Sequence, residues 1–282
     1  MKKLLFIAKI NILANIFLAI IKGFTGLAFG SISLISDAIN SIGDVLTAII
    51  IHFTIKINNE EPDHNHPFGH TRAESIAGYT IGILMIILAI TITKYSLEKL
   101  ITKNYGTYSI LLLYVVGISL AIKLFLYIYT KLSIKGKNTP ALSAIASDHL
   151  NDIIILFGVL IGVFGMKIGY PEIDALIGLL ISTIILKTGI VISYENIKQL
   201  MGQSASKKIE NKIRKKAEEI PGTIKINKIK TQYLGNQIQT EIEVFFSSKT
   251  SIKKAHNIGN KIRDNVESLD EIIDCFVHID SE

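Results

Sequence analysis

Residues 141–165 read ALSAIASDHLNDIIILFGVLIGVFG, an apolar stretch that carries two aspartates and a histidine. A helix needs roughly 20 predominantly apolar residues to cross the hydrocarbon core of a bilayer. Ionisable side chains are costly in that environment and are rarely kept there without a use. The stretch therefore predicts a transmembrane helix that also carries a functional site, which places the chain among the helical membrane proteins.

Five further segments are as long and as apolar, so we predict six transmembrane helices in the first two thirds of the chain. The predicted spans are 7–29, 31–55, 73–92, 109–128, 141–165 and 173–192. The first run continues past Lys22 without a small-residue cleavage site, which favours a retained helix over a signal peptide. An even number of spans places both termini on one side of the membrane. Most loop lysines and arginines lie on that side, which predicts a multi-pass protein of the cell (inner) membrane with cytoplasmic termini.

The last third of the chain is charged and alternates apolar with polar residues. Its predicted elements are a helix at 204–220, strands at 225–233 and 237–246, a helix at 251–266 and a strand at 271–279. These assignments rest on the period of the apolar residues and on turn signals such as Pro221-Gly222 and Gly235-Asn236. The order αββαβ predicts a ferredoxin-like α+β domain. We therefore expect a six-helix transmembrane domain at 1–200 and a cytoplasmic C-terminal domain at 201–282.

The composition excludes several classes of protein. The formal net charge of the 282 residues is +6. In a membrane protein such an excess ordinarily lies in cytoplasmic loops, so we predict no nucleic-acid partner. The single cysteine, Cys275, excludes an intrachain disulfide and a cysteine-based zinc cluster. No glycine-rich phosphate loop is visible, so the sequence does not indicate a nucleotide-driven motor.

Two pairs of polar residues lie four positions apart, Asn40 with Asp44 in the second span and Asp148 with Asp152 in the fifth. Each pair shares one helix face, and if the two faces meet, one amide oxygen and three carboxylates converge on one point. Two buried acidic pairs would cost much free energy without a ligand, so they predict a cation site. Isolated polar residues in spans more often link helices by hydrogen bonds. We assign that role to Asp37, Ser147 and Asn151.

The loop after the second span reads DHNHPFGH at 63–70 and concentrates three histidines beside an aspartate. Imidazole is a good ligand for zinc, iron and similar ions. Asp63, His66 and His70 are therefore a candidate surface metal site. A solvated polar loop with incidental histidines fits the sequence about as well.

Five short motifs together resemble the cation diffusion facilitator family over nearly the whole chain. They are SDAINSIGD (36–44), HPFGHTRAE (66–74), IASDHLND (145–152), AHNI (255–258) and VHID (277–280). The resemblance implies a homodimeric secondary transporter, not an enzyme, that exports a divalent metal ion from the cytoplasm in exchange for protons. It implies no prosthetic group, because the metal ion and the proton are the cargo.

The same resemblance implies three metal sites. The implied transport site consists of Asn40, Asp44, Asp148 and Asp152. The implied site of the cytoplasmic loop consists of Asp63, His66 and His70. The implied site of the C-terminal domain consists of His256, His278 and Asp280, in a domain that contributes to the dimer contact and senses cytoplasmic metal.

The donor atoms of the transport site bear on the identity of the metal. Zinc-transporting members of the family typically place a histidine in this quartet, where the chain has Asn40 and Asp148. An all-oxygen quartet favours a harder ion, manganese above all, and so resembles the manganese branch of the family. Zinc or iron is the alternative cargo. A modest rotation of the fifth helix would bring His149 into the site and restore a nitrogen ligand.

Several assignments stay open at the level of sequence. Zinc members commonly carry two more histidines where this chain has Asn227 and Glu243, so the C-terminal site is weaker, differently selective or absent. His256 fits an ordinary hydrogen-bonded helix residue about as well as a ligand. Lys123, inside the fourth span, either reaches toward the cytoplasmic side or pairs with an acid at the middle of the membrane.

Competition between protons and the metal ion for the same carboxylates explains how such a site would couple the transport of one to that of the other. Metal ligands must lose their protons to bind, so protons and metal exchange at one site, and rocking helices would expose it to each side in turn. A membrane metal sensor or scaffold is the alternative of another class, although it does not need an acidic quartet. A membrane metalloenzyme is disfavoured, because His66 and His70 lack the glutamate of a His-Glu-x-x-His motif.

Overall fold

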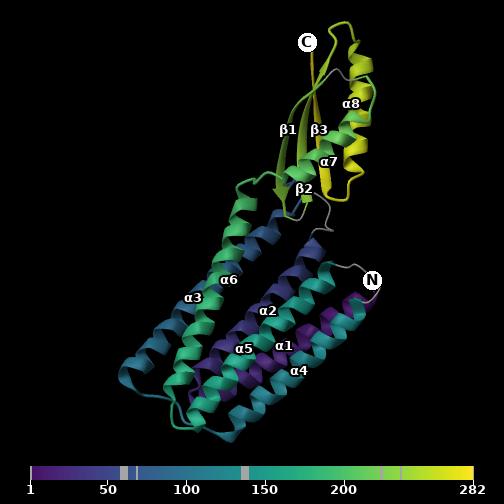
Figure 1. Ribbon diagram of the computed structural model, residues 1–282. Coiled ribbons are helices and arrows are strands. Elements are labelled where there is room, and N and C mark those ends of the chain that lie inside the picture. Colours follow the sequence, from purple (N-terminus) through teal and green to yellow (C-terminus); the bar gives the residue numbers. More distant parts are fainter. Residues whose placement is uncertain are drawn as a thin grey trace. The chain divides into compact units, whose positions relative to one another are not determined.

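The structure, a computed structural model, describes residues 2–57, 63–67, 69–134, 140–222, 225–235 and 237–281. Six long helices precede a small α+β part (Figure 1). The helices are α1 (Lys2–Phe29), α2 (Ile32–Ile57), α3 (Arg72–Thr102), α4 (Ile110–Ile134), α5 (Pro140–Lys167) and α6 (Glu172–Leu200). The chain divides into two compact units, Met1–His52 with Thr80–Ser193, and Phe53–Tyr79 with Tyr194–Glu282.

Within the described residues, six helices are long and apolar enough to cross a membrane. This confirms the predicted number of spans. Three helices run well past their predicted ends, since α3 ends at Thr102, α4 at Ile134 and α6 at Leu200. The prediction counted only the apolar residues that a bilayer requires. The extra turns of α3 and α6 carry lysines such as Lys99 and Lys198, which are good helix formers and do not end a helix.

The first unit is a helix bundle that is apolar inside and outside. α4 packs along α5, and α1 packs along α4, as can be followed in Figure 1. Buried side chains from α2 to α6 form one core that includes Leu34, Leu112 and Leu156. The outward faces expose other large apolar side chains such as Phe24 and Phe125. A helix that is hydrophobic all round is typical of a membrane span, because its outer neighbour is lipid.

A carboxylate from α6 caps the N-terminus of α2. Asp174, in the first turn of α6, is 3% exposed. It accepts hydrogen bonds from the Ser31 hydroxyl at 2.7 Å, from the Ile32 backbone N–H at 2.6 Å and from the Ser33 hydroxyl. The first N–H groups of a helix lack partners within it, and the helix N-terminus attracts negative charge. This contact, the Asp174 clasp, fixes the start of α2 to the start of α6.

α3 and α6 approach each other through two glycines. A Cβ atom added at Gly82 would lie 2.8 Å from the carbonyl oxygen of Gly189, and one added at Gly189 would lie 2.9 Å from that of Gly82. Small residues allow such close approach between transmembrane helices, where packing takes the place of the hydrophobic effect. A hydrogen bond of 2.9 Å between the hydroxyls of Thr93 and Ser182 joins the same two helices.

We expect Gly82→Leu to destabilise the folded protein by about 3 kcal/mol, because the larger side chain forces α3 away from α6. The matched control is Gly117→Leu in α4, where no atom of the described residues lies within 4 Å of an added Cβ atom. Leucine also has the higher helix propensity, so the control should lose no stability. Thermal unfolding in detergent compares the two variants, and equal melting temperatures would show that this contact does not hold α3 to α6.

The second unit contains the αββαβ part. Its elements are α7 (Lys207–Glu218), β1 (Lys225–Leu234), β2 (Gln237–Phe246), α8 (Ile252–Glu267) and β3 (Ile272–Ser281). β1 and β2 form an antiparallel hairpin, and β3 pairs with β2 in parallel after the crossover through α8. One core joins the sheet to both helices, with Ile213, Ile242 and Ile262 fully buried. The predicted ferredoxin-like order of elements is confirmed.

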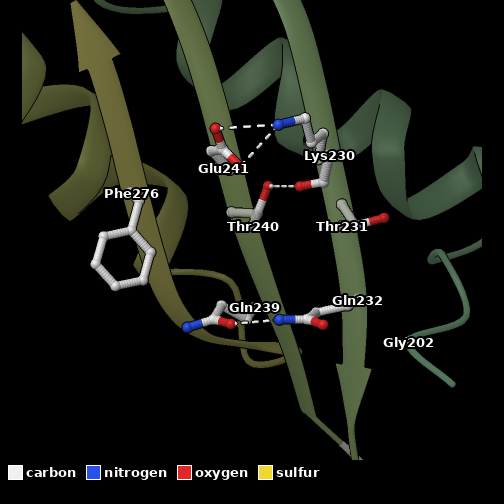
Figure 2. A pocket seen from close by; sticks show the side chains of 8 residues that line it. All are labelled: Gly202, Lys230, Thr231, Gln232, Gln239, Thr240, Glu241 and Phe276. Atoms are coloured by element: carbon white, nitrogen blue, oxygen red, sulfur yellow. Dashed lines mark hydrogen bonds and ion pairs between the residues drawn. The ribbon is translucent and has the colours of Figure 1, made fainter. Parts of the chain in front are cut away.

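The sheet also borders a hollow of about 350 Å³ (Figure 2). Cross-strand pairs line it, since Lys230 lies 3.1 Å from the Glu241 carboxylate and Gln232 donates to Gln239 at 2.7 Å. Phe276 of β3, half exposed, lies beside them. No histidine lines the hollow in the described part of the chain, and its polar groups are largely paired with one another.

Candidate metal centre

The second and fifth helices meet at the predicted polar residues. Nδ2 of Asn40 on α2 donates to Oδ1 of Asp152 on α5 at 3.0 Å. Asp152 is 5% exposed, and Asn40 is partly buried. The helical period then places Asp44 one turn from Asn40 and Asp148 one turn from Asp152. The structure thus brings one member of each predicted pair into direct contact.

A lysine from α4 lies between the acids. The side chain of Lys123 is fully buried. Its ammonium forms an ion pair with Oδ2 of Asp152 and lies 3.7 Å from Oδ2 of Asp44. It also donates to Oδ1 of Asn15 on α1 at 2.7 Å. Of the two alternatives that the sequence left open for Lys123, the structure shows the pairing with membrane acids.

Asp148 does not take part in this network of contacts. It lies one turn from Asp152 on α5, but its side chain is exposed. Among the described residues, the one group of three His, Cys, Asp or Glu side chains with all ligand atoms within 4.8 Å lies in the loop after α2. The three carboxylates of the predicted quartet are therefore further apart than that. Two of them, Asp44 and Asp152, share the ammonium of Lys123.

His149, the residue after Asp148, is buried without a partner. It is 3% exposed, and neither ring nitrogen has a hydrogen-bond partner among the described residues. Buried polar groups are ordinarily hydrogen-bonded, so an unpaired imidazole requires an explanation. Participation of His149 in metal binding stays a prediction, with both of its nitrogens free of described partners.

A second ion pair lies within the membrane unit. Nζ of Lys22 on α1 lies 2.8 Å from Oδ2 of Asp37 on α2 and donates to the Ser41 hydroxyl at 3.2 Å. Both charged side chains are essentially inaccessible to solvent. Asp37 was expected to link helices by a hydrogen bond, and its partner is a lysine that the sequence reasoning did not single out. A lysine inside an apolar span, as at Lys22 and Lys123, is the signal that would have found both pairs.

The predicted residues of the loop come together. Nδ1 of His66 lies 3.1 Å from Oδ1 of Asp63, and Nε2 of His70 lies 3.3 Å from Oδ2 of Asp63. These three side chains are the group with ligand atoms within 4.8 Å of one another. The backbone N–H of His66 donates to the Asp63 carboxylate and is the main reason why its pKa lies below the ordinary value. Asp63 is therefore charged at neutral pH and suited to bind a cation.

The loop lies against the C-terminal hairpin within the second unit. Gly235, in the turn between β1 and β2, has a φ of +63°. A Cβ atom there would lie 2.6 Å from the carbonyl oxygen of Thr71, the residue after His70. The Ser75 hydroxyl also donates to the Gln199 side chain at 2.9 Å. A rearrangement of this loop would therefore change its contact with the hairpin turn at Gly235.

The three candidate ligands of the C-terminal domain are not gathered. His256 is exposed on α8, where its Nε2 lies 3.1 Å from the side-chain amide of Asn260. His278 and Asp280 lie on β3, two residues apart, and His278 is exposed. The three do not form a group with ligand atoms within 4.8 Å among the described residues. In the structure of the single chain, the three predicted ligands therefore do not form one site.

Of the two departures noted in the sequence, Glu243 lies next to His278, and Asn227 lies next to Glu243. Nδ2 of Asn227 on β1 donates to Oε1 of Glu243 on β2 at 2.9 Å, and Glu243 pairs with His278 in the register of β2 and β3. This row offers one carboxylate and one imidazole to a cation. The nearby strand residue Cys275 adds no thiolate, because burial raises the pKa of its thiol to about 12.

Comparison with known proteins identifies the class to which this fold and these polar helices belong. The cation efflux transmembrane domain matches residues 8–201, and the cytoplasmic domain of cation efflux proteins matches residues 205–282. The chain therefore belongs to the cation efflux family of metal transporters, as its motifs predicted. It is a multi-pass membrane protein with a cytoplasmic C-terminal domain.

Relatives match it over most of their length. The uncharacterized transporter MJ0449 of Methanocaldococcus jannaschii is 33% identical over 275 residues, 96% of each chain. The manganese efflux system protein MneS of Bacillus subtilis is 26% identical over 273 residues, 97% of this chain and 94% of the relative. The magnetosome protein MamM of Magnetospirillum gryphiswaldense is 24% identical over 248 residues, 87% of this chain and 78% of the relative.

Proposed function

We propose that the protein exports manganese from the cytoplasm in exchange for protons, as a homodimer in the cell (inner) membrane with both termini cytoplasmic. The observation that carries the proposal is the contact between Asn40 and Asp152, which joins the two halves of an all-oxygen donor set. Oxygen donors suit Mn²⁺ better than they suit the softer zinc ion. The similarity to MneS, whose name describes manganese efflux, supports the same cargo.

Each donor has a defined task in this proposal. Asp44, Asp148 and Asp152 supply carboxylate oxygens, and Asn40 supplies an amide oxygen. Because Nδ2 of Asn40 faces Asp152 in the structure, the amide has to turn before its oxygen can meet the ion. The carboxylates bind metal only when deprotonated, so protons arriving from the outer side compete the ion off and are carried inward.

The remaining parts of the chain take supporting roles. In this proposal residues 1–200 form the transport domain, and residues 201–282 form the dimerisation and metal-sensing domain. The loop cluster of Asp63, His66 and His70 binds metal at the cytoplasmic side. The loop packs against the hairpin turn at Gly235, so metal bound to the loop would alter the position of this turn in the C-terminal domain.

Zinc is the second candidate cargo, and one observation favours it. His149 is buried beside Asp148 with both ring nitrogens lacking described partners. If α5 rotates during transport, this imidazole would replace an oxygen donor and raise the preference for a softer ion. Iron accepts both donor types and would be carried by either form of the site.

The test is metal uptake into proteoliposomes that contain the purified protein, with the interior made acidic. We expect Mn²⁺ uptake to exceed Zn²⁺ uptake by about tenfold, as the donor set favours the harder ion. A protonophore should abolish the uptake if protons are the counter-ion. Preferred zinc uptake would retain the transporter and favour a role for His149 as a ligand. Failure of both ions to move would favour a membrane metal sensor or scaffold.

A further inference from the structure

Both carboxylate oxygens of Asp152 are engaged by protein groups. Oδ1 accepts the hydrogen bond from Asn40, and Oδ2 forms the ion pair with Lys123. The same ammonium lies 3.7 Å from Asp44, the acid of the other helix. A cation that binds between α2 and α5 must therefore take the place that the ammonium of Lys123 holds.

The charges explain why a buried lysine is tolerated here. Three carboxylates around one divalent ion would leave a net negative charge within the membrane, which is costly. The positive charge of Lys123 brings this formal sum to zero. Lys123 also has a partner outside the quartet, since it donates to Oδ1 of Asn15 at 2.7 Å. The ammonium can therefore give up Asp152 and still keep a hydrogen-bond acceptor.

We propose that Lys123 is a tethered counter-ion of the transport site: its ammonium occupies Asp152 until the divalent ion replaces it, and it drives the ion off again by returning. The inference rests on the proposed function, because it assigns Asp44 and Asp152 to the cargo. It makes metal binding an exchange of one cation for another. Such an exchange lowers affinity and speeds release, which a transporter needs and a storage site does not.

Replacing Lys123 by methionine separates this role from a structural one. Methionine keeps the length of the side chain and removes its charge. We expect Lys123→Met to bind Mn²⁺ at least about tenfold more tightly, because the competing and repelling charge is gone. Turnover at saturating Mn²⁺ should fall, because nothing displaces the ion. KM and kcat should therefore fall together, whereas a structural defect would lower kcat and leave the affinity unchanged or weaker.

Two variants serve as controls. Lys123→Arg keeps the positive charge and should keep the affinity for Mn²⁺ near that of the wild type. Lys22→Met removes the other buried lysine, which pairs with Asp37 at 2.8 Å and, in the described part of the chain, forms no ion pair with a quartet residue. It should not tighten Mn²⁺ binding. Affinity is measured by isothermal titration of the full-length protein in detergent, and turnover by the proteoliposome assay.

The outcomes distinguish this inference from the proposed function. If wild-type protein moves Mn²⁺ but Lys123→Met binds it no more tightly, the counter-ion role is wrong and the function stands. If the wild type moves no divalent ion, the function itself fails. Should Lys123→Met not fold, Lys123→Gln takes its place in the same two measurements, because it also removes the charge. Binding of Mn²⁺ by Lys123→Gln that is no tighter than in the wild type would overturn the inference.

Discussion

Asp152→Ala is expected to lower Mn²⁺ uptake into proteoliposomes by more than about 100-fold. Loss of a group that merely supports a metal ligand typically costs 10- to 100-fold, so loss of a charged ligand should cost at least as much. Asp152 is also the point at which three helices meet, since it contacts Asn40 of α2 and Lys123 of α4 from its place on α5. Its removal therefore deletes a proposed metal ligand and the partner of a buried lysine together.

Two variants separate the effect on transport from an effect on folding. Asp152→Asn keeps the shape of the side chain and an acceptor for Asn40, but it lacks the charge, so uptake should remain near background. Asn151, which was expected to link helices, is exposed on α5, so Asn151→Ala should transport as the wild type does. All variants are compared by size-exclusion chromatography before reconstitution. Wild-type uptake by Asp152→Ala would show that the site between α2 and α5 is not the transport site.

Asn40→His is expected to shift the ratio of zinc to manganese uptake toward zinc by at least about tenfold. Imidazole nitrogen is a softer donor than an amide oxygen, and zinc accepts it readily. Asn40 already contacts Asp152 at 3.0 Å, so a side chain at this position reaches the acids of α5. The ratio is measured in one preparation with both metals offered at equal concentration.

Asn40→Ala provides the comparison for that shift. Alanine removes the oxygen without adding a nitrogen, so uptake of both metals should fall and their ratio should stay near that of the wild type. A ratio that is the same in the histidine and alanine variants would mean that residue 40 does not coordinate the cargo. His149 would then be the residue to replace next.

The fold followed from the sequence because its signals are local. Each span is one uninterrupted apolar run, and each element of the C-terminal part is bounded by turn residues such as Pro221-Gly222. The loop cluster was predictable for the same reason, since Asp63, His66 and His70 lie within eight residues of one chain segment. The short chain segment between such residues limits the distance that can separate their side chains.

The transmembrane site was predictable only in part, because three helices build it. The helical period places Asn40 and Asp44 on one face of α2, and Asp148 and Asp152 on one face of α5. The helical period does not determine which face α4 turns toward α2 and α5. The position of Lys123 between the acids depends on how the helices pack, which only the structure shows. The C-terminal candidates were the least predictable. His256 and His278 lie on different elements, α8 and β3, and no local sequence signal determines the distance between their side chains.

In the proposed transport cycle, the Asp174 clasp would act as a pivot of the bundle. It joins the first residues of α2 to the first turn of α6, so these two ends cannot separate without exposing three donors. Asp44 lies about 12 residues further along α2, roughly 18 Å away at 1.5 Å per residue. A tilt of about 10° around the clasp would move Asp44 by roughly 3 Å, more than the length of a metal–oxygen bond. In the proposed transport cycle, such a rotation would suffice to assemble or dismantle the coordination sphere.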